Sequence, residues 1–326
     1  SHHTDTIGPG GVFKALRTVP VLLEVCRDME SVCPDAWLLQ YTNPMAIACW
    51  AIADSTHVST VGLCHSVQRT TNQLAEYIGV GTPNISALVA GINHMAWFLR
   101  FETEGRDAYP ALWKALEDPD LYASDAVRFE VMKHFGYFVT ESTRHMSEYV
   151  PYFRTNPDEM ARFGLDEISS ELSRITARSR EHYDEIRRDI DSTSPLICRR
   201  SDEYAVLIME AMETGHPVVI NGNVPNRSLI TNLSKGACVE VPCLVDGLGV
   251  HPTTIGVLPS HLAALNSSNI AVQELTKQAI LGHSRRTALH AVMLDPLTSA
   301  VLTLENIKTM FDEMWEAHDY MLTTYS

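Results

Sequence analysis

A cysteine and a histidine stand side by side at the end of an apolar run, in Val61-Gly62-Leu63-Cys64-His65. A second histidine, His94, directly follows the next apolar run of the chain. An ionised thiol is either a metal ligand or a nucleophile, and a neutral imidazole is the commonest metal ligand in proteins. A lone Cys64 is more often a small buried hydrophobic residue. Together with His94, and with Asn43 after an earlier apolar run, it indicates a site.

The segments around these residues predict strands that alternate with helices. Apolar stretches at 37–41, 59–63 and 85–92 are separated by helical patterns from about residue 46 and over 68–77. Such alternation is typical of βαβ units and a parallel sheet. Open α/β sheets bind ligands at the carboxyl ends of their strands. We therefore expect Asn43, Cys64 and His94 at one edge of a parallel sheet.

The rest of the chain is predicted to form further strands and helices outside the parallel set. Residues 97–104 alternate as an antiparallel strand, and a helix over 125–135 ends at Gly136, a typical C-cap. Residues 160–190 predict a charged, solvated helix pair, and 201–214 another helix. Strands are expected at 218–220 and 237–244, and helices from Pro259 to the end. Glu240 lies inside an apolar strand, where a buried carboxylate must be paired or functional.

The first residues, Asp-Thr-Ile-Gly-Pro-Gly-Gly at 5–11, predict a glycine-rich turn before a helix. Backbone N–H groups at such a helix start bind anions and hydroxyl-rich ligands. The segment is not a G-x-G-x-x-G fingerprint, and no strand precedes it. The glycines alone favour a plain loop.

Composition excludes several classes of protein. The 326 residues are 45% hydrophobic and 20% charged, which is ordinary for a globular protein, and the net charge is −15. An acidic chain without a basic cluster argues against binding to nucleic acid or to anionic membranes. No apolar run reaches the roughly 18 residues of a membrane span. Seven scattered cysteines predict reduced thiols in the cytoplasm.

Six motifs, in order along nearly the whole chain, resemble the NAD- and manganese-dependent glycosidases of glycoside hydrolase family 4, with the bacterial α-galactosidases as the nearest likeness. They are Asp-Thr-Ile-Gly-Pro-Gly-Gly (5–11), Tyr-Thr-Asn-Pro-Met (41–45), Gly-Leu-Cys-His-Ser-Val-Gln (62–68), Gly-Ile-Asn-His-Met (91–95), Gly-Tyr-Phe-Val-Thr-Glu-Ser (136–142) and Val-Glu-Val-Pro-Cys-Leu-Val-Asp (239–246).

The resemblance implies an α/β fold related to lactate and malate dehydrogenases. Residues 1–95 would be the remainder of a dinucleotide-binding domain with a partial Rossmann-like parallel sheet. Residues 96–326 would form a mainly helical α+β domain for substrate, metal and oligomerisation, in a homo-oligomer (dimer or tetramer). The family begins with a βαβ half that carries the nucleotide fingerprint, and no stretch of this sequence corresponds to it. We therefore expect a truncated form that binds NAD weakly and has little activity alone.

The resemblance also assigns roles. Cys64 and His94 would be the protein ligands of the divalent metal, Mn²⁺. Asn43 would lie between the nicotinamide and the sugar, with Gly8, Gly10 and Gly11 near the cofactor. His65 would contact substrate or leaving group.

Four side chains are implied in catalysis. Tyr137 matches the tyrosine base, with Tyr149, Tyr152 and Glu141 as rivals, and Asp5, Glu141 and His65 could assist departure of the aglycone. Glu240 more readily supports structure than chemistry.

The implied reaction is hydrolysis of an α-galactoside through NAD-dependent oxidation, elimination, water addition and re-reduction, an exception to the two-carboxylate scheme. An unphosphorylated sugar is expected, because the motifs contain no cluster of arginines or lysines.

Several alternatives stay open. An α-glucosidase or α-galacturonidase of the same family is one alternative. A 2-hydroxy-acid dehydrogenase would share Thr-Asn-Pro but would not need a Cys/His pair. A zinc hydrolase would need a third protein ligand. A non-catalytic sugar-binding remnant would need neither the metal ligands nor the catalytic side chains.

Overall fold

One mixed sheet of eight strands runs through the chain in this computed structural model, which describes residues 6–165, 168–192, 195 and 203–326. Its strand order is β1-β2-β6-β7-β3-β4-β5, with β8 against β7. The strands are β1 (Trp37–Gln40), β2 (Ser59–Leu63), β3 (Ile85–Ile92), β4 (Met95–Thr103), β5 (Arg106–Asp107), β6 (Val218–Pro225), β7 (Cys238–Asp246) and β8 (Gly249–Pro252).

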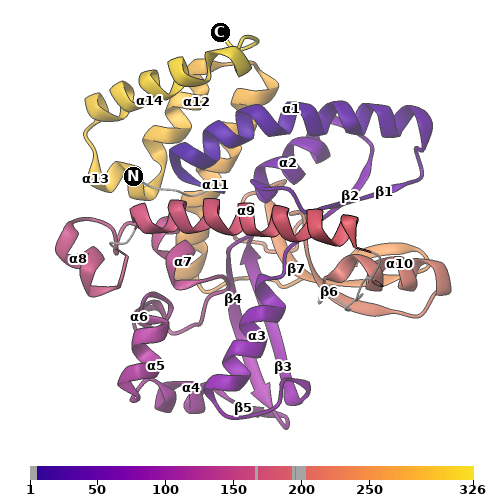
Figure 1. The fold of residues 1–326 in the computed structure, drawn as a ribbon. Helices are drawn as coiled ribbons and strands as arrows, with labels where there is room; N and C mark the ends of the chain where they lie inside the picture. The colour runs from indigo at the N-terminus through magenta and orange to yellow at the C-terminus, as the bar shows by residue number, and fades with distance from the viewer. Residues whose placement is uncertain (1–5, 166–167, 193–194, 196–202) are drawn as a thin grey trace.

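Helices surround this sheet (Figure 1). They are α1 (Gly8–Val32), α2 (Met45–Ser55), α3 (Ser66–Tyr77), α4 (Tyr109–Ala115), α5 (Pro119–Ser124), α6 (Ala126–Phe135), α7 (Thr143–Tyr149), α8 (Pro157–Arg162), α9 (Ile168–Asp191), α10 (Tyr204–Thr214), α11 (Ser260–Leu281), α12 (Arg285–Leu294), α13 (Pro296–Val301) and α14 (Leu304–His318), with short 3₁₀ turns at Thr82–Asn84 and Asp319–Met321. The α/β class is confirmed. Within the described residues, no helix is at once long and apolar enough to cross a bilayer.

The parallel part of the sheet is smaller than predicted. Strands β1 and β2 pair in parallel, with Leu39 opposite Val61. Strand β3, predicted as a third parallel strand, instead pairs antiparallel with both β4 and β7. The two-residue turn at Asn93 and His94 fixes β3 and β4 as an antiparallel pair. Strands β6 and β7 lie between β2 and β3, and each neighbouring pair from β2 to β3 is antiparallel, so β3 runs opposite to β2. The expected parallel arrangement of all three strand ends is therefore wrong.

Two helices cover the parallel pair. The apolar spacing of α1 (Val12, Leu16, Val19 and Leu23) places one buried stripe along a 25-residue helix. Helix α2 is buried without interruption from Met45 to Ile52, because it lies between α1, α11 and the sheet. Together with α11–α14 these helices form the upper part of the molecule in Figure 1. Helix α1 starts at Gly8, so the expected loop at Gly8–Gly11 is a helical turn.

The β3–β4 hairpin carries a separate apolar core. Phe98, Phe101, Phe129 and Phe138 belong to it, together with side chains of α3, α4 and α6. The hairpin and these helices form the lower part of Figure 1. Helix α6 ends at Gly136, whose φ of 79° confirms the predicted C-cap. Strand β4 begins at the boundary expected at residue 95, and the sheet continues through it to β6 and β7. The division into two domains at this residue stays a prediction.

Four residues face one another across the middle of the sheet. Gly62 of β2 pairs with Asn223 of β6, Asn223 with Glu240 of β7, and Glu240 with Gly91 of β3. Both glycines are required by space: a Cβ on Gly62 would lie 2.7 Å from the Cys49 sulfur, and one on Gly91 would lie 2.6 Å from the Met95 carbonyl oxygen. This row joins the strand that leads to Cys64 with the strand that leads to His94.

Asn266 of α11 fastens that helix to the start of β4. Its side chain accepts from Trp97 Nε1 at 3.0 Å and donates to the Met95 carbonyl at 2.8 Å, and it is fully buried. In Asn266→Ala both partners lose their hydrogen bonds inside the core, so we expect a loss of about 2–4 kcal/mol of unfolding free energy. Urea unfolding would measure it, with the exposed Asn306→Ala as control. A loss no larger than the control's would contradict this role.

Candidate metal centre and adjoining cavity

Cys64 follows the last residue of β2 and precedes the first turn of α3. His65 is the N-cap residue of that helix and makes no side-chain capping bond. The Cys64 side chain is 6% exposed. The end of the strand therefore delivers a buried thiol to the carboxyl edge of the parallel pair, as the sequence predicts.

His94 occupies the second position of the hairpin turn between β3 and β4. Its φ of 65° lies in the left-handed region, which costs roughly 1 kcal/mol or more for a residue other than glycine. The side chain is nevertheless 4% exposed and points inward. A turn that accepts this strain to bury an imidazole is typical of a functional position.

Glu141 comes from the loop between α6 and α7. Thr140 holds this loop against β4, since its N–H donates to the Ala96 carbonyl at 2.8 Å and its hydroxyl accepts from the Ala96 N–H at 3.1 Å. Glu141 itself has a φ of 76°. Two of the three side chains gathered here therefore rest on left-handed backbone.

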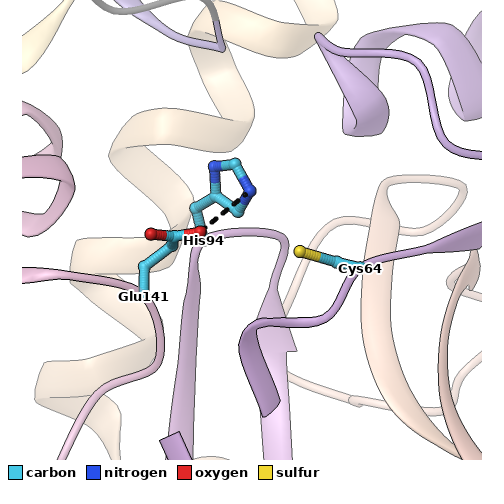
Figure 2. A group of neighbouring side chains, drawn as sticks. All are labelled: Cys64, His94 and Glu141. Carbon is cyan, nitrogen blue, oxygen red and sulfur yellow. Dashed lines mark ion pairs between the residues drawn. The ribbon is translucent and has the colours of Figure 1, made fainter. Parts of the chain in front are cut away.

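Figure 2 shows Cys64, His94 and Glu141 turned toward one another. One ligand atom from each lies within 4.8 Å of the other two, and His94 Nε2 is 3.5 Å from Glu141 Oε1. The side chains come from β2, the β3–β4 turn and the loop before α7. The structure thus brings the predicted ligands Cys64 and His94 together and adds Glu141 to them.

The electrostatics of this group favour a cation. Burial raises the pKa of the Cys64 thiol to about 12, with Glu240 and Glu141 adding to the shift and Ser66 opposing it. Burial alone would raise the pKa of Glu141 as well, but His94, His145 and His65 bring it below its ordinary value. A divalent metal supplies the positive charge that would deprotonate the thiol.

The donor set fits a divalent transition metal. Thiolate, imidazole and carboxylate suit zinc or a neighbouring ion, and three protein ligands leave open positions for water or substrate. A third ligand also meets the requirement of the zinc-hydrolase alternative. Ligand count alone therefore does not separate that alternative from the family resemblance.

Glu240 lies fully buried next to this group. Neither of its carboxylate oxygens has a hydrogen-bond partner, although Asn223 is close enough to lower its pKa slightly. Burial raises the pKa of Glu240 to about 8, and the charge of Glu141 adds to the shift. Its charge therefore acts on Cys64, and no ion pair to it is found among the described residues.

A cavity of about 390 Å³ borders the metal-ligand group, large enough for a monosaccharide. His65, Ser66 and Glu141 form the wall nearest to the ligands. The rest of the lining is mostly polar or charged and comes from α3, α5, α6, α7 and the adjoining loops: Arg69, Thr70, Gln73, Ser124, Asp125, Arg128, Ser142, Thr143, Arg144, Gly164 and Leu165.

Two predicted substrate-binding residues lie at the strand ends. His65 is 37% exposed, and its Nδ1 is 3.6 Å from Glu203 Oε1 at the start of α10. Asn43 is half-buried between β1 and α2, and its Oδ1 has no hydrogen-bond partner. An unpaired buried acceptor of this kind suits a ligand with hydroxyl or amide donors.

The remaining predicted residues are more scattered. Asp5 lies outside the described residues. Gly8 and Gly11 are buried and Gly10 is half-buried in the first turn of α1. The N–H of Gly8 faces the buried Asp295, where it partly offsets the rise in the pKa of that carboxyl that burial causes.

Tyr137 is not brought to the metal-ligand group. It lines a different cavity with Arg100 and Trp113, and its ring contacts those of Tyr109 and His261 at 6.2 and 6.3 Å. The rival Tyr149 lies at the site instead, with its ring edge-on to His94 at 6.3 Å.

Sequence reasoning missed His145, whose ring is 5.4 Å from that of His94 and whose Nδ1 is 3.9 Å from Glu141 Oε2. It also missed Ser66 and the arginines of the cavity. His145 stands four residues after Glu141 in the same polar stretch, so the density of ionisable residues there was the available signal for it.

Comparison with known proteins decides the family. Residues 1–80 match the family 4 glycosyl hydrolases, and residues 89–298 match the C-terminal domain of the same family. The chain belongs to the family 4 glycosyl hydrolases. It is 43% identical over 324 residues to an α-galactosidase of Bacillus subtilis (98% of this chain, 74% of the relative) and 36% identical over 335 residues to an α-galactosidase of Rhizobium meliloti (99% and 68%).

Solved structures agree on the fold. The crystal structure of lplD from Bacillus subtilis superposes with a TM-score of 0.83 at 25% identity, over 95% of this chain and 75% of that one. A 6-phospho-α-glucosidase from gut microorganisms, solved in complex with NAD and Mn²⁺, gives a TM-score of 0.78 at 22% identity, over 98% and 75%. The family 4 fold of this chain is thereby shown.

The ligand assignment predicts the metal content of variants. Cys64→Ser, His94→Ala and Glu141→Gln should each weaken Mn²⁺ binding by at least the roughly 10–100-fold that loss of an outer-shell partner costs. The exposed Cys33→Ser is the matched control for the thiol. Because the thiol must lose its proton, affinity should also fall as the pH is lowered. Elemental analysis and calorimetric titration would show this, and unchanged affinity in all three variants would refute the assignment.

Glu240 predicts a pH dependence of stability in the metal-free protein. With a folded pKa near 8 and an ordinary value of 4.5, the folded state keeps a proton that the unfolded state releases between these two values. Stability from this group is therefore complete below pH 4.5 and is lost as the pH rises through 8, by the order of a few kcal/mol. Urea unfolding in a chelator at pH 5–8 should give a flatter profile for Glu240→Gln.

The exposed Glu76→Gln is the control for this titration. Cys64, Glu141 and Tyr204 also face Glu240 and remain in both proteins. Parallel profiles of the wild type and Glu240→Gln would exclude Glu240 as the source of the dependence.

Proposed function

We propose that this chain carries the metal and sugar site of an α-galactosidase that depends on NAD and Mn²⁺. The observation that carries the proposal is the Cys64–His94–Glu141 group beside a cavity of sugar size. The identity of 43% to an α-galactosidase over 98% of the chain supports the sugar. NAD and Mn²⁺ are supported by the complex of the gut 6-phospho-α-glucosidase.

Cys64, His94 and Glu141 would hold the metal, and Asn43 and the start of α1 at Gly8, Gly10 and Gly11 would face the nicotinamide. A bound cation would supply Lewis-acid polarisation of a carbonyl oxygen, and a bound nicotinamide would supply reversible hydride transfer. The protein then supplies position, proton transfer and exclusion of water.

The proton on carbon 2 of the sugar requires a base. We propose Tyr149 for this role, since its ring contacts His94 and its hydroxyl donates to Thr6 at 2.8 Å inside the core. A tyrosine has an ordinary pKa of about 10, and a nearby cation favours the phenolate. Tyr137 stays the competing candidate, supported by its motif, as does Glu141.

The departing aglycone requires a proton donor. His65 stands at the cavity wall with Glu203 3.6 Å from its Nδ1, and a carboxylate in that position orients an imidazole. We propose His65 as this acid, with Asp5 of the same motif set as the alternative. The free thiols of the described cysteines support a cytoplasmic enzyme, and we propose a homo-oligomer.

The test is hydrolysis of aryl α-galactosides with catalytic NAD and Mn²⁺, against α-glucosides and α-galacturonides. We expect the galactosides to be cleaved fastest. Faster cleavage of the α-glucosides or of the α-galacturonides would assign the enzyme the corresponding specificity within its family. Hydrolysis that proceeds equally well without NAD would overturn the proposed chemistry.

Hydrolysis in deuterated water tests the base. NMR of the released sugar should show deuterium at carbon 2, because elimination removes that proton. Tyr149→Phe should lower kcat by about 10²-fold or more with little change in substrate affinity. Tyr137→Phe is the matched variant, and full activity in Tyr149→Phe with loss in Tyr137→Phe would return the role to Tyr137.

A further inference from the structure

Two further cavities lie apart from the one beside the metal-ligand group and share no lining residue with it. Their volumes are about 390 and 410 Å³, so each can hold one monosaccharide. Aromatic rings line both cavities: Tyr109, Trp113 and Tyr137 in the first, and Phe135, Tyr152 and Phe153 in the second. None of the proposed metal ligands lines either cavity, so the role of these cavities is separate from metal binding.

Stacked and tilted rings connect the two cavities. The ring of His261 on α11 contacts those of Tyr137 and Phe135, with centroid distances of 6.3 and 6.2 Å. Phe135 in turn lies 6.1 Å from Tyr152. We call these four residues the aromatic row. Two of them, His261 and Tyr152, are exposed, and an exposed apolar surface bordered by polar residues is typical of a binding site.

Hydrogen bonds hold the rings in place before any ligand binds. His261 Nε2 is 3.0 Å from the Phe135 carbonyl oxygen. The Tyr109 hydroxyl donates to the Phe98 carbonyl and accepts from the Phe138 N–H at 3.1 Å. A surface whose side chains are already fixed loses less conformational entropy when a ligand binds.

The charged groups beside the rings are paired with one another. In the first cavity, Arg100 Nε lies 3.7 Å from Glu102 Oε1. In the second, Arg162 Nη1 lies 3.5 Å from Glu159 Oε2. Each cavity also holds a second carboxylate, so neither favours an anion. Apolar ring faces with mixed donors and acceptors suit a neutral ligand that has both an apolar face and hydroxyl groups. Sugars are ligands of this kind, and the chain belongs to a family of glycosyl hydrolases.

We propose that the aromatic row, together with Trp113, is a second carbohydrate site that binds a neutral oligosaccharide. The C–H face of a sugar ring would pack on the aromatic faces, which carry the negative part of the ring quadrupole. Two cavities of monosaccharide size joined by a row of rings favour several linked sugar units over a single one. The inference goes beyond the proposed function, because the site contains no metal ligand. It assigns Tyr137 a binding role that fits its place away from the metal-ligand group.

Calorimetric titration with the neutral tetrasaccharide stachyose, in a chelator and without NAD, measures binding in the absence of turnover. Stachyose should bind about tenfold or more tightly than galactose, because a longer sugar contacts more rings. Trp113→Ala and Tyr152→Ala should each weaken stachyose binding by about tenfold. Trp113→Phe keeps a ring at this position and should retain most of the affinity.

Two variants serve as controls. Tyr320→Ala removes an exposed tyrosine outside both cavities and should leave the affinity for stachyose unchanged. Arg69→Gln alters the cavity beside the metal-ligand group and should also leave this affinity unchanged. No binding of stachyose, equal affinities for stachyose and galactose, unchanged affinity in both aromatic variants, or an equal loss in Arg69→Gln would overturn the inference.

Sedimentation of the same variants tests whether the rings instead bind another copy of the chain. A smaller oligomer in Trp113→Ala and Tyr152→Ala, with unchanged affinity for stachyose, would assign the aromatic row to a subunit interface and overturn the sugar site. The proposed function is judged separately by the hydrolysis of aryl α-galactosides.

Discussion

The arrangement of the site depends on the pairing of four residues across the sheet. Gly62, Asn223, Glu240 and Gly91 lie opposite one another on β2, β6, β7 and β3. Cys64 follows two residues after one end of this row, and His94 three residues after the other. Because a slip of one residue turns every side chain to the opposite face, this register fixes whether thiol and imidazole meet. Because neither glycine has a side chain, the neighbouring groups can pack this closely around both strands.

The same row contributes to the electrostatics that favour a cation at the Cys64–His94–Glu141 group. Glu240 lies in its centre without a hydrogen-bond partner for its oxygens, and Cys64 and Glu141 come to the same place. Two carboxyl groups and a thiol in one buried space repel one another when ionised. His94 and His145 offset part of that charge. A divalent ion offsets more of it in a single step, so binding a metal and ionising the ligands are one equilibrium.

Sequence patterns selected the residues of the candidate site better than they predicted how the strands that carry them are paired. Cys64 and His94 were identified because each follows an apolar strand, and that holds although β3 is not a parallel strand. The two-residue hairpin turn places His94 beside Cys64. The prediction had assigned this placement to the ends of parallel strands. Glu141 could be named as a carboxylate near the site. Its place beside His94 depends on a loop that Thr140 holds against β4. Such a contact between distant segments cannot be predicted from a local sequence pattern.

The positions of the tyrosines and arginines around the site could not be predicted from the sequence. Tyr137 and Tyr149 are 12 residues apart (149 − 137) in one polar stretch, and only the packing of α7 against the hairpin turn places Tyr149 beside His94. Arg69, Arg128 and Arg144 converge from three helices because α3, α6 and α7 enclose one cavity. A cluster of charge in space has no signature along the chain unless its members share one element. The motifs thus identify the candidate metal ligands, and the tertiary packing of these helices forms the cavity beside them.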